Sequence, residues 1–136
     1  MDLKANCIWK EGFKADIDNG RGHNVKIDLP EHQGGTNSAP TALELTVMSF
    51  AGCVVTIFAL LAKKMQVDFK SLLCEVSAQK PDGAGTVTNC DIIVKINSEA
   101  SDEKIKLCLD KTVKICPVGV IFERAGITVK ANLERV

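Results

Sequence analysis

Two cysteines occupy the segments of this sequence that are best suited to sulfur chemistry. Cys53 lies in SFAGCVVTIF, residues 49–58, where small polar residues and a thiol interrupt an otherwise apolar stretch. Cys116 lies in KICPVGVIFERAG, directly before a proline. A thiolate is a strong nucleophile that attacks peroxides and disulfides and forms covalent intermediates. The two thiols can therefore support redox chemistry if the fold brings their sulfur atoms together.

The local surroundings of the two cysteines leave chemistry and packing both open. The proline after Cys116 suits the first position of a new helical turn, which makes Cys116 its predicted N-cap. Free backbone N–H groups and the dipole at such a site favour a thiolate. Cys53 lies on a face of small residues, with Ser49, Gly52 and Thr56, where another helix can approach closely. Free cysteine is, however, among the most buried residue types and often only fills space.

The elements that must position these thiols follow from the periodicity of the chain. Residues 5–9, 13–17 and 25–29 follow a two-residue period and predict three half-buried antiparallel strands joined by tight turns. A polar loop rich in turn formers follows them. Residues 71–79 and 86–97 predict two more strands around the turn KPDGAG, and residues 127–133 predict the last strand.

Two helices complete the predicted fold. Residues 45–62 contain no charge, and their length favours a helix, although the β-branched VVTI weakens that prediction. A second helix is predicted to begin near SEASDEK, which offers serine caps and acidic residues for the first turn. Helical spacing places five of its residues on one buried stripe: Ile105, Cys108, Leu109, Thr112 and Cys116. The predicted order is βββ-α-ββ-α-β, a single α+β domain over residues 1–136.

Composition excludes several classes of function. Lys+Arg and Asp+Glu both number 17, so the chain has no basic footprint for nucleic acid or anionic lipid. Five Phe, one Trp and no Tyr give no aromatic set for stacking bases. No two of the six cysteines are two residues apart, and both histidines are remote from them, so no metal site and no cofactor are expected. The first residues do not resemble a signal peptide, so we expect a cytoplasmic protein with reduced cysteines.

The long uncharged segment has two interpretations. Eighteen helical residues span about 27 Å, which is close to the thickness of a bilayer core. Strands flank the segment on both sides, however, and half-buried strands need a helix to pack on. A helix that is apolar all round must be covered on every side, and a second subunit is the simplest cover. We therefore expect a buried helix that bridges two subunits, and no membrane span.

Two long motifs resemble the OsmC/Ohr family of osmotically induced and organic hydroperoxide resistance proteins. They are GTNSAPTALELTVMSFAGC, residues 35–53, and CPVGVIFERAGITVKANLE, residues 116–134. The resemblance covers nearly the whole chain and implies an OsmC-like fold. In that fold, long central helices are wrapped by antiparallel sheets in an intertwined homodimer. It also implies a cysteine-based peroxidase that reduces organic hydroperoxides and is restored by a dithiol reductant.

The resemblance assigns roles to four residues. Cys53 takes the position of the peroxidatic cysteine and Cys116 that of the resolving one. Family peroxidases activate the first cysteine with an arginine from the N-terminal strands, which a glutamate holds; here the candidates are Arg21 and Glu44. Glu44 lies nine residues before Cys53, one fewer than in the peroxidase pattern, so it points away from Cys53 on its own helix. His23 is an alternative donor to Cys53.

An apolar substrate site is expected next to this pair, at the subunit interface. The residues predicted to line it are Phe50, Val54, Phe58 and Phe122, which would suit an apolar peroxide tail. Two other functions remain open: a non-catalytic protein that binds a small lipid-like ligand, and a thiol redox sensor without turnover. The cysteines at 7, 74 and 90 are expected to fill space in strands, and Cys108 is expected to lie too far from Cys116 for a bond.

Overall fold

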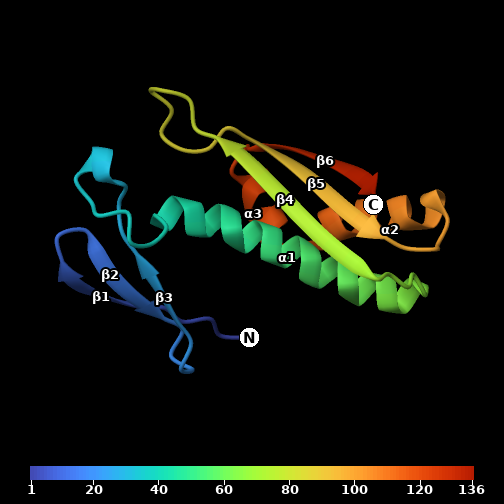
Figure 1. The fold of residues 1–136 in the computed structure, drawn as a ribbon, viewed down its shortest axis with the longest axis horizontal. Coiled ribbons are helices and arrows are strands. Elements are labelled where there is room, and N and C mark those ends of the chain that lie inside the picture. Colours follow the sequence, from blue (N-terminus) through green and yellow to red (C-terminus); the bar gives the residue numbers. More distant parts are fainter. The chain divides into compact units, whose positions relative to one another are not determined.

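The computed structural model describes residues 1–136 (Figure 1). The chain forms two compact units, Met1–Thr46 and Val47–Val136. The organisation of the whole chain as one domain stays a prediction. All the predicted strands and both predicted helices are present, so the α+β class is confirmed.

The first unit contains a three-stranded antiparallel sheet in the order β1-β2-β3. Its strands are β1 (Asn6–Glu11), β2 (Lys14–Asp18) and β3 (Asn24–Ile27). Cys7 pairs with Ile17, and Ile17 pairs with Val25 on the other side. Every residue of β1 is exposed, and Ala15 is the one buried residue in the three strands. The sheet therefore has almost no core of its own within this unit.

A buried carboxylate organises the loop after β3, which includes the 3-10 helix η1 (Glu31–Gln33). Asp28 is 2% exposed. Its Oδ2 accepts hydrogen bonds from the backbone N–H and the hydroxyl of both Thr36 and Ser38, and its Oδ1 accepts one from Leu29 N–H. These bonds, led by that of the Thr36 hydroxyl, lower the pKa of Asp28 well below its usual value. One carboxylate thus holds the loop that leads toward the long helix.

The second unit packs helices against a three-stranded sheet in the order β4-β5-β6. Its strands are β4 (Ser71–Gln79), β5 (Asn89–Asn97) and β6 (Thr128–Arg135). Its helices are α1 (Ala42–Met65), α2 (Asp102–Ile115) and α3 (Pro117–Arg124). The part of α1 from Val47 on belongs to this unit. β4 and β5 are antiparallel, but β6 pairs with β5 in parallel, which differs from the expected antiparallel sheets. The reason is the connection: two helices lie between β5 and β6, and such a crossover returns the chain in the same direction.

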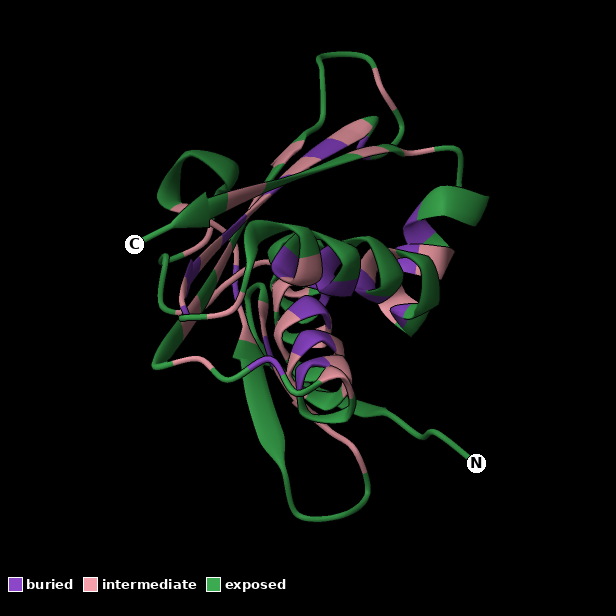
Figure 2. Cartoon of the chain, turned by 90° about the vertical axis from the view of Figure 1, so that its right-hand side faces the viewer, coloured by how far each residue is buried: buried purple, intermediate pink, exposed green.

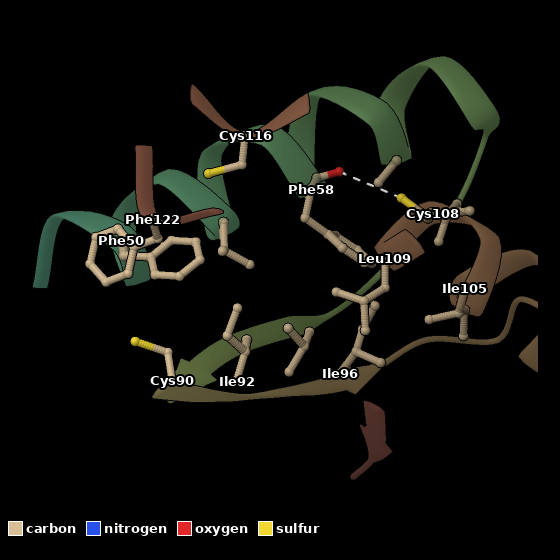
Figure 3. Packing of buried hydrophobic residues seen from close by; sticks show 14 of the residues in the cluster. Phe50, Phe58, Cys90, Ile92, Ile96, Ile105, Cys108, Leu109, Cys116 and Phe122 are labelled. Carbon is tan, nitrogen blue, oxygen red and sulfur yellow. Dashed lines mark hydrogen bonds between the residues drawn. The ribbon is translucent and has the colours of Figure 1, made fainter. Parts of the chain in front are cut away.

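The core of the second unit lies between one stripe of α1, the inner face of the sheet and α2 (Figure 3). On α1 the buried residues recur every fourth position, at Phe50, Val54, Phe58 and Ala62. On β5 every second residue is buried, from Cys90 to Ile96. The predicted stripe of α2 is buried throughout, and so is Cys116 beyond its end, which confirms that prediction.

The opposite face of α1 remains exposed in a single chain. Met48 is 56% exposed and Leu60 is 53% exposed, and Gly52 and Thr56 lie on the same face. Each α-helix accordingly has buried residues on one side and exposed residues on the other (Figure 2). By length and composition alone α1 is able to cross a membrane, a test that the core helix of a soluble protein also passes. One copy of the chain does not supply the cover that the sequence predicts for this helix.

Candidate active site

The second unit brings Cys53 and Cys116 into contact. Their Sγ atoms are 2.7 Å apart, and the Cys116 thiol donates a hydrogen bond to Cys53 Sγ. Both thiols are free, because a disulfide requires a separation of about 2.05 Å. Cys53 is partly exposed, whereas Cys116 has no exposed surface. Two segments that are distant in sequence thus form one dithiol pair.

A break between two helices positions Cys116. Its backbone N–H donates to Thr112 O and closes α2, while its side chain accepts a hydrogen bond from Gly119 N–H at 3.4 Å. Pro117 follows as the first residue of α3, where its missing N–H costs nothing. Cys116 is therefore the N-cap of α3, as predicted. The same residue ends one helix and starts the next, which restricts the position of its sulfur.

The protonation of Cys116 differs from the expectation for a helix N-cap. Burial raises the pKa of the Cys116 thiol to about 11, and the hydrogen bond to Cys53 acts in the same direction. The Gly119 N–H lowers the pKa but does not outweigh the loss of solvation. The N–H groups and helix dipole that favour a thiolate at this N-cap are thus outweighed by burial, which favours the protonated thiol.

Two aromatic rings form the apolar wall behind the pair. Phe50 lies three residues before Cys53 on α1, and Phe122 lies on α3. Their ring centroids are 4.6 Å apart at an interplanar angle of 40°, and the two rings lie side by side (Figure 3). Gly119 lies against this wall, since a Cβ built on it would be 3.1 Å from Phe50 Cε2. We did not predict a role for Gly119, although its place three residues after an N-cap cysteine is visible in the motif CPVG.

The four residues expected to line a substrate site all belong to the closed core. Phe50, Val54 and Phe58 are 0% exposed and Phe122 is 3% exposed. A fully buried side chain offers no surface to a ligand until its neighbours move. Their contact with a substrate stays a prediction, and their observed place is in the core of the second unit.

The predicted activating residues both belong to the first unit. Arg21 is exposed in the turn after β2, where its backbone N–H bonds to Asn19 Oδ1 and the Asn19 amide meets His23 Nδ1. Glu44 Oε2 accepts from Thr41 N–H at 2.7 Å, and Thr41 Oγ1 accepts from Glu44 N–H at 3.1 Å. This is a capping box at the start of α1, and its bonds lower the pKa of Glu44. The roles of Arg21 and Glu44 toward Cys53 stay predictions.

The remaining cysteines divide into three packed thiols and one exposed thiol. Cys108 is buried and its thiol donates to Phe58 O at 3.8 Å. Cys90 is buried and Cys74 partly buried on neighbouring strands, and burial raises the pKa of both. Cys7 is exposed on β1, so within the chain it does not fill the core as predicted. No group of three or more His, Cys, Asp or Glu side chains is arranged to hold a metal ion.

The fold and the site define an α+β protein with a pair of contacting thiols, one partly exposed and one buried. The family model described as OsmC-like protein matches residues 35–132. The chain belongs to the OsmC-like family. No curated protein matches its sequence.

Solved structures share the fold at low sequence identity. The OsmC-like protein from Mycoplasma pneumoniae has a TM-score of 0.88 at 18% identity, over 100% of this chain and 98% of the other. An organic hydroperoxide resistance protein OsmC from Legionella pneumophila has a TM-score of 0.77 at 14% identity, over 98% and 97%. An organic hydroperoxide resistance protein from Elizabethkingia anophelis has a TM-score of 0.77 at 15% identity, over 100% and 97%.

Proposed function

We propose that this protein is a cytoplasmic cysteine-based peroxidase that reduces organic hydroperoxides, with Cys53 as nucleophile and Cys116 as resolving thiol. The observation that carries the proposal is the 2.7 Å contact between their sulfur atoms. A partly exposed thiol backed by a buried one is the arrangement that a two-thiol peroxidase needs. Membership of the family and the hydroperoxide resistance proteins among its structural relatives support the same substrate class.

The reaction divides into two thiol steps and one reduction. The Cys53 thiolate attacks the terminal oxygen of the hydroperoxide, the O–O bond breaks, and the alkoxide leaves and takes up a proton as the alcohol. Cys53 is then a sulfenic acid. The Cys116 sulfur attacks the Cys53 sulfur, its own proton leaves with the hydroxyl group as water, and a disulfide forms. A dithiol reductant attacks this disulfide, becomes oxidised, and returns both cysteines to thiols.

In this proposal the positive charge of Arg21 stabilises the Cys53 thiolate, and Glu44 holds Arg21 in place. The test is a pair of variants, Arg21→Gln and Glu44→Gln, assayed for the rate of the first step. A loss of on the order of a hundredfold or more at Arg21 would support charge stabilisation of the thiolate. Equal rates in both variants and the parent would show that neither residue activates Cys53. Glu44 would then act only in its capping box, and Arg21 only in its turn.

A homodimer belongs to the proposal because one face of α1 is uncovered. Met48 and Leu60 are exposed there beside the small residues Gly52 and Thr56, so a second copy of α1 can approach closely. Sedimentation of the detergent-free protein is expected to give the mass of a dimer. Partition into the membrane fraction would contradict both the dimer and the soluble helix.

The function is tested with a bulky organic hydroperoxide and a small dithiol reductant. The parent protein is expected to consume the peroxide, and Cys53→Ser to lose about a hundredfold or more of the rate. Cys116→Ser should still react once per Cys53 but cycle slowly. The matched control is Cys7→Ser, which replaces an exposed thiol outside the site.

Three outcomes separate this function from its alternatives. Peroxide consumption by Cys53→Ser at the parent rate would overturn the enzyme assignment. Formation of the Cys53–Cys116 disulfide without dithiol-dependent turnover would identify a redox sensor. An apolar ligand retained through purification, with no oxidation of either thiol, would identify a binding protein.

A further inference from the structure

We propose that Gly119 is the positioning residue of the resolving step. Because it has no side chain, α3 can approach α1 closely enough to hold Cys116 Sγ against Cys53 Sγ. This inference rests on the proposed function, since it assigns a residue to the second step of that reaction. Gly119 touches neither the peroxide nor the reacting oxygen, so it acts through Cys116.

The first observation is the direct bond between Gly119 and the resolving sulfur. Gly119 N–H donates to Cys116 Sγ at 3.4 Å in the first turn of α3. Gly119 is itself buried, so water does not compete for this bond. The bond ties the orientation of the Cys116 side chain to the backbone of α3, and any movement of α3 therefore moves the sulfur.

The second observation is the space that a side chain at Gly119 would need. A Cβ there would be 3.1 Å from Phe50 Cε2, 3.5 Å from Phe50 Cζ and 3.5 Å from Cys116 Cβ. The first distance is shorter than an ordinary carbon–carbon contact of about 3.5–4.0 Å. A methyl group at position 119 therefore pushes the Phe50 ring or α3 away by a few tenths of an ångström.

The Phe50 ring has no free space into which it can move. Phe50 is 0% exposed, and the Phe122 ring also packs against it, at 4.6 Å between centroids. Close-packed interiors transmit such strain to neighbouring elements instead of absorbing it. Phe50 lies on α1 three residues before Cys53, so its contact with Gly119 is part of the same α1–α3 approach that joins the sulfurs. A methyl group at Gly119 thus separates Cys116 Sγ from Cys53 Sγ.

The chemical consequence is confined to the second step. In that step the Cys53 sulfenic acid and the Cys116 thiol form an S–S bond and release water. Attack requires close and aligned sulfur atoms, and a displacement of about 1 Å can cost on the order of a hundredfold in rate. The first step needs only Cys53 and the hydroperoxide. Slow resolution leaves the sulfenic acid open to a second hydroperoxide, which oxidises it to the sulfinic acid and releases another alcohol.

The test compares Gly119→Ala with the parent and with the double variant Phe50→Leu/Gly119→Ala. Diamide accepts two electrons and two protons from the thiol pair, so it reports on sulfur geometry without any peroxidase activity. We expect formation of the Cys53–Cys116 disulfide to be about tenfold slower in Gly119→Ala. Leucine lacks the ring atoms that meet the new methyl group, so the double variant should recover most of the rate. Gly85→Ala is the matched control, because a Cβ on this glycine meets no atom within 4 Å.

A second readout uses the hydroperoxide itself. Mass spectrometry is used after one equivalent of hydroperoxide and again after an excess. The Cys53 thiol should be lost at the same rate in Gly119→Ala and in the parent. It should also show more Cys53 sulfinic acid in Gly119→Ala. A merely structural role would slow both steps together or neither.

The outcomes distinguish failure of this inference from failure of the proposed function. If the parent protein does not react with hydroperoxides, the proposed function is wrong. The diamide rates still test whether Gly119 positions the two sulfurs. Disulfide formation at the parent rate in a folded Gly119→Ala overturns the role of Gly119. If Gly119→Ala does not fold, the diamide rate of Phe50→Leu is compared with that of Phe50→Leu/Gly119→Ala. A folded Phe50→Leu/Gly119→Ala with the diamide rate of Phe50→Leu supports the inference, because loss of the ring then restores a protein that the methyl group alone disrupts. A tenfold loss in that pair, or a double variant that also fails to fold, overturns it.

Discussion

The two units of this protein are stabilised by different kinds of interaction. Every buried residue of the apolar cluster belongs to the second unit, from Phe50 to Phe122. The first unit buries little beyond Ala15 and Asp28, and its loop depends on the hydrogen bonds of one carboxylate. The first unit therefore buries little apolar surface of its own, and a small apolar core contributes little stability.

The thiol pair belongs to the unit that has the apolar core. Cys53 and Cys116 are both attached to helices that pack on the core of the second unit. The predicted charged partners Arg21 and Glu44 belong to the unit without such a core. The contact between the two sulfurs therefore follows from the apolar packing of the second unit.

The largest expected effect contrasts one phenylalanine from each unit. Phe58→Ala removes a 0% exposed ring from the second unit, and we expect a loss of about 3–5 kcal/mol in the free energy of unfolding. Phe13→Ala removes a ring that is 53% exposed, and we expect a loss below about 1 kcal/mol. Urea unfolding of both variants measures the difference. An equal loss at Phe13 would show that its surface is buried in solution.

The next effect is an alkaline loss of stability in the second unit. The pKa of Cys116 is raised from 9.0 to about 11, so the folded protein holds a proton that the unfolded chain loses. This contribution is complete below about pH 9 and is lost as the pH rises to about 11, by up to about 2–3 kcal/mol.

Urea unfolding across that pH range tests the assignment to Cys116. The slope of stability against pH should be smaller in Cys116→Ser, because serine does not titrate there. Cys74, with its pKa also raised to about 11, accounts for part of the remaining slope. The exposed Cys7→Ser should behave as the parent protein. An unchanged slope in Cys116→Ser would contradict the assignment.

A smaller and local effect is expected in the first unit. The pKa of Asp28 is lowered by its hydrogen bonds, so the carboxylate stabilises the fold above about pH 4 and this contribution is lost as the pH falls further. Asp28→Asn replaces one accepting oxygen with a donor that faces other donors. We expect faster hydrogen exchange at the amides of Thr36 and Ser38, with little change in the unfolding of the second unit.

The control for this change is Asp2→Asn, which alters an exposed carboxylate near the N-terminus. Its exchange rates should match those of the parent. If Asp28→Asn instead destabilised both units equally, the loop would be part of one cooperative structure, and the contrast between the units would not hold.

The smallest effect concerns surface ion pairs, which occur in both units. Lys10 and Asp16 are 3.5 Å apart in the first unit, and Lys70 and Glu99 are 3.8 Å apart in the second. Both pairs lie at the surface and are screened by solvent, so Lys10→Gln and Glu99→Gln should each cost less than about 1 kcal/mol in urea unfolding. A larger cost at Lys10 would again indicate that the first unit is covered in solution.

Local sequence patterns predicted much of this architecture. Alternation over residues 71–79 corresponds to β4, and the i, i+3, i+4 spacing that begins at Ile105 corresponds to the buried stripe of α2. The proline after Cys116 predicted the N-cap, because proline has no N–H to lose at the first helical position. Each of these features depends on neighbours within a few residues, and sequence order contains that information.

Other features depend on contacts between segments that are distant in sequence. The parallel pairing of β6 with β5 follows from the helical crossover between them, and alternation within a strand does not encode its direction. The close approach of Gly119 to Phe50 likewise depends on how α3 meets α1. The periodicity of a helix or strand indicates which of its faces is buried. It does not indicate which residue of another element packs against that face.

The sequence by itself therefore determined the order of helices and strands, the buried stripes, the cap at Cys116 and the family. Only the tertiary structure decided that Cys116 Sγ touches Cys53 Sγ and that burial raises the pKa of the Cys116 thiol. The physical reason is that propensity and capping act through adjacent backbone groups. The solvation of a thiol and the distance between two sulfurs are set by every segment that packs around them.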